Sequence, residues 1–353
     1  MSQNREQWGS KLGFILAASG SAVGIGNIWK YPHMAGQNGG AAFTLVYLAC
    51  ILVVGLSIVI AEFVIGRKTQ LSPVGAFEKL APGTGWKWVG FLGVASAFVI
   101  LSFYGVVGGW VLKYVIVSIT GGFNELAGDP DAAGKVFNTF ITDTWSPIIY
   151  QVFFMAFCVW VIVNGVKGGI EKWSKIMMPL IVVLLAVLAV RGMTLPGGMK
   201  GISFLFNPRF EDLTANSIVL ALGHSFFTVS LGMGTMITYG SYLNRKQNLL
   251  NSAVWVIALN TAIAMLAGIA IFTTVFALGA NPAEGPGLIF VVLPSVFSQL
   301  AGGTLWGTMF FVLLFMAALT SAISILEVVT AYFIDQKGGS RKKATIQFGA
   351  VIT

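Results

Sequence analysis

The chain has 353 residues, of which 56% are hydrophobic and only 10% carry a charge. A soluble domain of this length needs far more charged side chains to cover its surface. The composition therefore excludes an ordinary soluble protein and indicates one that lies in a bilayer. The net charge of +8 could suggest a nucleic-acid partner, but its distribution along the chain indicates a membrane orientation instead.

Eight continuous apolar stretches each approach the roughly 20 residues that a membrane-spanning helix requires. We expect spans at 11–37 (broken), 41–66, 88–118, 148–164, 173–191, 214–240 (broken), 249–279 and 304–334. Because the apolar runs are continuous rather than alternating, a membrane β-barrel is disfavoured. The chain then ends inside a ninth apolar segment, Ala344–Thr353, which is too short to cross. We therefore expect a protein truncated after its eighth span.

Basic side chains are distributed unevenly between the two sides of these spans. If the N-terminus is cytoplasmic, most of the 21 Lys and Arg residues lie in inner loops, whereas the acidic stretch from Glu125 to Asp143 lies outside. An excess of Lys and Arg in cytoplasmic loops is the general rule for membrane proteins. We expect a multi-pass protein of the cell membrane, either a bacterial inner membrane or a plasma membrane, with a cytoplasmic N-terminus.

Glycines, hydroxyls and amides interrupt the first and sixth spans near the middle of the bilayer. One interruption runs from Gly20 to Asn27 and the other from Thr228 to Thr235. Each glycine costs roughly 1 kcal/mol of helix propensity relative to alanine, and a backbone group freed in lipid needs a partner. Close helix packing through Gly20-x-x-x-Gly24 is one explanation. Paired interruptions in the two halves instead indicate a transporter built from inverted repeats.

Several long motifs occur in order around these interruptions: Arg5-Glu6-Gln7-Trp8, Gly20-x-Ala22-Val23-Gly24-x-Gly26-Asn27-x-Trp29-Lys30-Tyr31-Pro32, Asn38-Gly39-Gly40-Ala41-Ala42-Phe43, Phe226-Phe227-Thr228-Val229-Ser230-Leu231-Gly232-x-Gly234, Ser298-Gln299-x-x-Gly302-Gly303 and Leu319-Thr320-Ser321. Together they resemble the neurotransmitter:sodium symporter family, in particular its bacterial, leucine-transporter-like members. The resemblance implies an all-α, polytopic membrane protein with the inverted-repeat (5+5) transporter fold and broken helices one and six. It further implies one transmembrane transporter domain over 1–353, with a first repeat at about 8–191 and a second at about 210–353 that lacks its C-terminal spans.

The resemblance also implies an activity: a sodium-coupled symporter, not an enzyme, that imports a neutral, hydrophobic or aromatic L-amino acid by alternating access. Its partners would be that small molecule, sodium ions and the lipid bilayer, without nucleic acid. Sodium is a hard cation and prefers oxygen ligands. By resemblance, the first of two ions would be held by Ala22, Asn27, Thr228 and Asn260 together with the substrate carboxylate. The second would be held by Gly20, Val23, Ala317, Thr320 and Ser321, although the last two hydroxyls could instead bond back within their own helix.

The substrate would be held by the unwound backbone of both broken helices. The resemblance implies that the amides of Gly24 and Gly26 face its carboxylate with the Tyr104 hydroxyl, and that Phe227 and Ser230 face its ammonium and the outer gate. The full implied set is Ser21, Ala22, Gly24, Gly26, Ile100, Tyr104, Phe227, Thr228, Ser230, Met233, Ser321 and Ile325. Its large apolar members, and Gly24 where amine-transporting animal members carry Asp, favour a neutral apolar amino acid. Ordinary helix packing would explain each aromatic residue taken singly.

Charged residues near the ends of the spans match gate positions. Arg5 and Asp335 match the cytoplasmic gate pair of the family, and Lys30 matches the basic residue of the outer gate. Solvated charges at the membrane interface are the simpler explanation for the pair. Glu62 and Glu327 are expected to be the only acids within spans, and Glu62 matches a position that helps to hold the broken first helix.

Chloride coupling is uncertain from the sequence, because neither charge-compensation scheme of the family is intact. Tyr47 and Asn260 are present, but Ala264 stands where a serine or an acid is expected, and His224 replaces a glutamine. His224 could exchange protons, since imidazole titrates near physiological pH. A neutral, hydrogen-bonding histidine is the simpler alternative, because burial disfavours the cation.

Other classes of protein find little support in this sequence. The chain has two histidines, two cysteines in separate spans, and no metal-hydrolase or nucleophile motif, so the common enzyme chemistries lack their residues. Nothing resembles a carbonyl filter or a ring of charges, as a channel would need. The remaining alternative is a non-transporting amino-acid-binding membrane receptor or an inactive fragment.

Overall fold

The computed structural model describes residues 5–126, 129–279 and 287–353, and these residues form helices with no strand beyond one isolated bridge between Gly40 and Pro208. The longer elements are α3 (Ala41–Cys50) continued by η2 (Ile51–Gly55) and α4 (Leu56–Thr69), α6 (Lys87–Ile119), α8 (Ser146–Val163), η4 (Val166–Glu171) continued by α9 (Lys172–Thr194), α13 (Leu249–Ala277) and α16 (Gly303–Lys337). Each of these six helical stretches is long and apolar enough to cross a bilayer. The expected spans two to five, seven and eight are therefore confirmed, with ends that differ by a few residues.

The first expected span is broken as anticipated. It consists of α1 (Lys11–Ala22), then η1 (Gly26–Lys30) with α2 (Tyr31–Gln37), and the two parts meet at 53°. Ser10 caps the start of α1 by accepting a hydrogen bond from the Gly13 amide, and α1 ends where Val23 adopts an extended backbone. Counted as one span, this bent pair is the seventh segment among the described residues that could cross a membrane.

The sixth expected span is also broken, into α11 (Ala215–Thr228) and α12 (Thr235–Ser241). Between them the backbone adopts positive φ at Ser230 (54°), Gly232 (81°) and Gly234 (81°). Glycine tolerates this region freely, whereas a serine there is uncommon. Neither half is long enough to cross a bilayer alone, so this span exists only as two half-helices joined by six residues of extended or turning chain.

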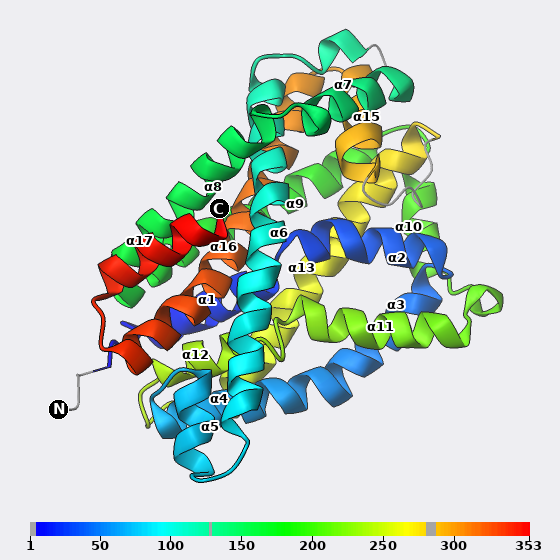
Figure 1. The fold of residues 1–353 in the computed structure, drawn as a ribbon. Helices are drawn as coiled ribbons and strands as arrows, with labels where there is room; N and C mark the ends of the chain where they lie inside the picture. The colour runs from blue at the N-terminus through cyan, green and yellow to red at the C-terminus, as the bar shows by residue number, and fades with distance from the viewer. Residues whose placement is uncertain (1–4, 127–128, 280–286) are drawn as a thin grey trace.

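α16 is the most buried of the long helices and packs against α6, α8 and α9 (Figure 1). Nearly every residue of α16 from Leu313 to Ala331 is buried. On α6, a Cβ at Gly109 would lie 2.6 Å from the backbone nitrogen of Gln151 on α8, so only glycine allows this approach. Small residues at such contacts are the usual means by which membrane helices pack.

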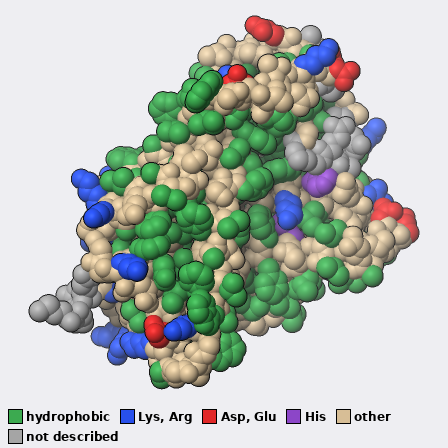
Figure 2. Space-filling model, in the orientation of Figure 1, with side chains coloured by type: hydrophobic (Ala, Val, Ile, Leu, Met, Phe, Trp, Pro, Cys, Tyr) green, Lys and Arg blue, Asp and Glu red, His purple; other side chains and the backbone are tan. Residues whose placement is uncertain are grey.

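Shorter helices cap the two ends of the bundle: α5 (Pro73–Leu80), η3 (Asn124–Leu126), α7 (Pro130–Thr142), α10 (Met199–Phe206), η5 (Phe210–Asp212), η6 (Leu288–Val292) and α15 (Leu293–Gln299). The last helix, α17 (Arg341–Ile352), contains the ninth apolar segment and packs against α8 and α16. Figure 2 shows hydrophobic side chains over the middle of the visible face, with Lys and Arg gathered near the end that carries α4, α5 and the N-terminus. This distribution suits a protein surrounded by lipid.

Candidate functional site

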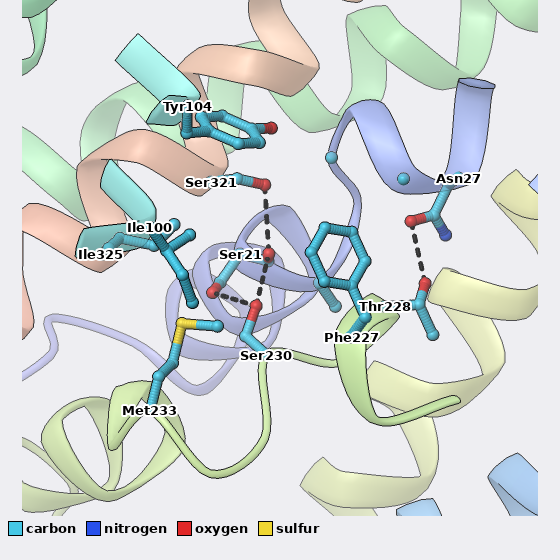
Figure 3. A pocket seen from close by; sticks show the side chains of 13 residues that line it. Ser21, Asn27, Ile100, Tyr104, Phe227, Thr228, Ser230, Met233, Ser321 and Ile325 are labelled. Atoms are coloured by element: carbon cyan, nitrogen blue, oxygen red, sulfur yellow. Dashed lines mark hydrogen bonds between the residues drawn. The ribbon is translucent and has the colours of Figure 1, made fainter. Parts of the chain in front are cut away.

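A cavity lies where the two helix breaks meet (Figure 3). Its lining contains all twelve residues predicted to contact the substrate and adds Asn27, which was predicted only as an ion ligand: Ser21, Ala22, Gly24, Gly26, Asn27, Ile100, Tyr104, Phe227, Thr228, Ser230, Met233, Ser321 and Ile325. The cavity offers about 30 Å³ to the centres of water molecules, which is room for one or two waters. A larger ligand enters only if side chains around the cavity move.

One end of the cavity is polar and built largely from backbone. The Tyr104 hydroxyl accepts a hydrogen bond of 3.3 Å from the Ile25 amide in the first break. A Cβ on Gly24 would lie 2.6 Å from Ser321 Oγ and 3.0 Å from the Tyr104 hydroxyl. Residue 24 therefore has space only for glycine. An acidic side chain at this position would have to displace both Ser321 and Tyr104.

The other end of the cavity is apolar. Ile100 comes from α6, Ile325 from α16 and Met233 from the break in the sixth span, and the three lie together (Figure 3). Phe227, from α11, lies across the cavity beside Gly26. Phe227 is 40% exposed while Met233 is 7% exposed, so the phenylalanine ring forms the accessible edge. None of the described residues that line the cavity carries a charge.

Ser230 lines the cavity and also joins the two breaks. Its hydroxyl donates a 3.0 Å hydrogen bond to the Ser21 carbonyl, and the Ser21 hydroxyl donates to Ser324 at 2.7 Å. These bonds hold the two breaks against each other and against α16.

Oxygen atoms from three helices converge beside the polar end of the cavity. Thr228 Oγ1 lies 2.9 Å from Asn27 Oδ1 and 3.2 Å from Asn260 Oδ1. Asn260 Oδ1 accepts a 2.8 Å hydrogen bond from Asn27 Nδ2. It also lies 3.2 Å from the Ala22 carbonyl oxygen and 3.3 Å from the Thr228 carbonyl oxygen, neither of which can donate. A half-turn of the Asn260 amide would satisfy these carbonyls with NH donors. A hard cation among the oxygens would satisfy them equally well, so the donor set fits the first predicted sodium ion.

The residues predicted for a second ion are brought together only in part. Gly20 and Thr320 are adjacent, since a Cβ on Gly20 would lie 3.3 Å from Thr320 Cβ. The Thr320 hydroxyl bonds back to the Ala317 carbonyl at 3.0 Å and reaches the Val23 carbonyl only at 3.5 Å. Ser321 does not bond within its own helix: its hydroxyl donates to the Ser21 carbonyl at 3.1 Å, on the cavity side. Gly20, Val23, Ala317 and Thr320 therefore lie next to one another. The Ser321 hydroxyl points toward the cavity.

The two residues predicted as a gate pair, Arg5 and Asp335, are in contact. Arg5 and Asp335 make an ion pair whose side chains are 14% and 8% exposed, and Arg5 donates a further bond of 2.7 Å to Ser241. Trp8 donates from its indole nitrogen to the Tyr239 carbonyl at 3.0 Å. The segment before α1 thus lies across the end of α12. Isolated, solvated charges are ruled out as the explanation of Arg5 and Asp335.

Lys30, predicted at the outer gate, lies on the other side of the cavity. Its ammonium is 4.6 Å from the centre of the Phe227 ring, within the range of a cation–π contact. Lys30 therefore covers the accessible edge of the cavity together with Phe227.

The buried acids correct two expectations. Glu62 accepts a 2.9 Å hydrogen bond from the Gly232 amide, so it contacts the break of the sixth span rather than the first helix. Glu171 is a third acid within a span, because the fifth span begins at Val166 and not near residue 173. Its carboxylate accepts from the Gly9 amide and the Ser10 hydroxyl. Sequence reasoning missed Glu171 because it placed the start of this span at residue 173.

Glu327 belongs to a network that the sequence did not predict. Its buried carboxylate accepts from the Tyr242 hydroxyl and pairs with Arg341 at 2.7 Å, and Arg341 also pairs with Glu6 at 2.8 Å. The network ties the N-terminal segment to α12, α16 and α17. Arg341 lies outside the predicted spans, so only the fold brings it to Glu327.

His224 is 1% exposed and lies beside Tyr47, with ring centres 5.2 Å apart. Among the described residues neither of its ring nitrogens has a hydrogen-bond partner. The expected hydrogen-bonding histidine is therefore not seen. Burial disfavours the imidazolium cation, and no acid among the described residues forms an ion pair with it.

Comparison with known proteins places this geometry in context. A family model described as the sodium:neurotransmitter symporter family matches residues 5–127 and 141–353. The uncharacterized sodium-dependent transporter YhdH of Bacillus subtilis is 43% identical over 99% of this chain and 77% of its own length. An uncharacterized sodium-dependent transporter of Haemophilus influenzae is 37% identical over 98% of this chain and 77% of its own length.

A solved structure is also similar to this fold. The crystal structure of MhsT in complex with L-phenylalanine matches with a TM-score of 0.91 and 50% identity, over 99% of this chain and 79% of that one. More distant relatives include a sodium-dependent serotonin transporter of Drosophila melanogaster, 26% identical over 95% of this chain and 60% of its own length.

Proposed function

Because this chain belongs to the sodium:neurotransmitter symporter family, we propose that it imports a neutral, hydrophobic or aromatic L-amino acid together with sodium by alternating access. Membership makes it a sodium-coupled, multi-pass membrane transporter rather than an enzyme. The substrate class, the ion sites and the orientation form the proposal. Two repeats, at about 8–191 and about 210–353, would move relative to each other around the fixed cavity.

The observation that carries the substrate class is the lining of the cavity. Its polar end consists of backbone, hydroxyl and amide groups, and its other end of Ile100, Met233 and Ile325, while Phe227 covers the accessible edge. No described lining residue is charged. A zwitterionic amino acid with an apolar side chain matches both ends. An amine without a carboxylate would lack a counter-charge, because Gly24 leaves no acid to pair with it. The L-phenylalanine in the similar MhsT structure agrees with this class.

The ends of the half-helices give the site its electrostatics. Helices α1 and α11 end at Ala22 and Thr228, where their free carbonyl groups lie. The helices η1 and α12 begin at Gly26 and Thr235, where their free amide groups lie. Carbonyl ends attract cations and amide ends attract anions. Sodium and the substrate ammonium would therefore lie near the first pair, and the substrate carboxylate near the amides of the first break. A carboxylate shared with the first ion would couple the two ligands directly.

Accommodation of such a substrate requires movement of the cavity edge. Phe227 is the most exposed lining side chain named above and lies under Lys30. Rotation of this ring outward, with adjustment of the flexible Met233 thioether, would enlarge the contracted cavity. The intact Arg5–Asp335 pair keeps the opposite, cytoplasmic end closed in the proposed orientation.

Flux measurements in proteoliposomes test the proposal. With an inward sodium gradient, radiolabelled L-phenylalanine should accumulate above its external concentration, and replacement of sodium by choline should abolish accumulation. Unlabelled leucine and tryptophan should compete, whereas dopamine and GABA should not. Sodium-dependent binding without any flux would identify the receptor instead, and displacement by dopamine alone would refute the assigned substrate class. Replacement of chloride by gluconate in the same assay determines whether chloride takes part.

A further inference from the structure

A basic hollow lies at the start of the fifth span, away from the cavity. It is lined by Lys167, Gly168, Glu171, Lys172, Lys175 and Ile176 from η4 and α9. All three lysines are exposed, and only Lys175 has a carboxylate partner there, the buried Glu171. Within the described part of the chain, Lys167 and Lys172 form no ion pair. Two uncompensated cations therefore face one hollow.

An exposed apolar stripe runs along α9 away from these lysines. Ile176, Leu180, Val183 and Val187 are 49%, 40%, 55% and 39% exposed. Their spacing of four, three and four residues places them on one face of the helix. At 1.5 Å per residue, the distance from Lys175 to Val187 is about 18 Å. This is close to the depth of one leaflet, since the hydrocarbon core is about 30 Å thick.

We propose that this hollow is a binding site for an anionic phospholipid, whose phosphate is held by Lys167, Lys172 and Lys175 and whose acyl chain lies along the α9 stripe. Two neighbouring features favour an anionic phospholipid. Lysine clusters at the membrane surface attract acidic headgroups. The apolar stripe begins at Ile176, directly after Lys175, where an acyl chain attached to such a headgroup would start. In the orientation proposed above, the lipid belongs to the inner leaflet.

The position of the site connects the lipid to the N-terminal segment. Glu171 pairs with Lys175 on one side and holds the Gly9 amide and the Ser10 hydroxyl on the other. The stem of Lys167 also lies against Gly9, where a Cβ would be 3.0 Å from Lys167 Cε. The hollow therefore adjoins the segment that carries Arg5.

Retention of lipid by the purified full chain tests the site. The protein is reconstituted in nanodiscs of phosphatidylcholine with a minor share of phosphatidylglycerol, and retained phosphatidylglycerol is counted by native mass spectrometry after release. Lys167→Gln with Lys172→Gln should weaken retention about 30-fold, because each basic residue near the surface contributes about a factor of 5. The matched double variant Lys167→Arg with Lys172→Arg should retain the lipid.

A control removes the same charge elsewhere among the basic residues at that end. Lys68 and Lys246 are exposed and remote from η4 in sequence, and their double Gln variant should keep wild-type retention. Equal loss in this control would show general electrostatic attraction and overturn the site. Competition by soluble glycerol phosphate as strong as that by the lipid would show a free-anion site and overturn the lipid assignment. Sodium-dependent phenylalanine binding by every variant confirms that each has folded.

Discussion

Thr228 offers the sharpest single test of the oxygen cluster beside the cavity. It is 1% exposed, and its hydroxyl oxygen lies within 2.9 Å of Asn27 Oδ1 and 3.2 Å of Asn260 Oδ1. Thr228→Val keeps the shape of the side chain but removes this oxygen. Loss of one buried polar partner costs about 1–3 kcal/mol, which corresponds to an increase of about 5- to 150-fold in the sodium concentration needed for half-maximal binding.

The assay is equilibrium binding of radiolabelled L-phenylalanine at a saturating amino-acid concentration while sodium is varied. Thr235→Val is the matched control, because Thr235 is also fully buried on the sixth span but its hydroxyl has no hydrogen-bond partner among the described residues. We expect sodium dependence to shift in the first variant and to stay unchanged in the second. An unchanged sodium dependence in Thr228→Val, with binding retained, would refute the assignment of this cluster to an ion.

Three further outcomes follow from contacts around the cavity. Asp335→Asn breaks a mostly buried ion pair, and such a change costs about 3–5 kcal/mol. Amide hydrogen exchange in the N-terminal segment should therefore accelerate. The control, Asp212→Asn, removes an exposed ion pair and should leave exchange in that segment unchanged. Glu62→Ala leaves the Gly232 amide without its acceptor, so the melting temperature and phenylalanine binding should both fall. The control, Glu78→Ala on the exposed face of α5, should change neither quantity. His224→Gln should preserve the pH profile of uptake, since the imidazole is buried and neither ring nitrogen has a hydrogen-bond partner among the described residues. A shifted profile would instead support proton exchange.

The spans could be predicted because lipid imposes a simple condition on sequence, namely long, continuous apolar runs. Their exact ends could not. The fifth span begins at Val166 rather than at the predicted residue 173, and hydrogen bonds from the N-terminal segment to Glu171 stabilise this additional turn. The two breaks were predictable from clustered glycines and hydroxyls, whose propensity for helix is low.

The cavity was predictable as a set of residues but not in its internal bonds. The motifs locate Ser230 in the lining, yet only the fold shows its hydroxyl bound to Ser21. In the same way, the sequence marks Glu62 as a costly buried acid, but not that it holds Gly232. Hydrogen bonds between distant segments depend on backbone positions that differ by less than an ångström. Sequence patterns specify which side chains are near and leave such pairings open.

The most direct test of shared binding at the two breaks is a reciprocal measurement on one preparation. Phenylalanine binding is measured at increasing sodium, and radioactive sodium binding is measured at increasing phenylalanine. Because linkage is reciprocal, the account predicts that each ligand raises the affinity of the other by the same factor. Sodium and phenylalanine that bind with affinities independent of each other would contradict it.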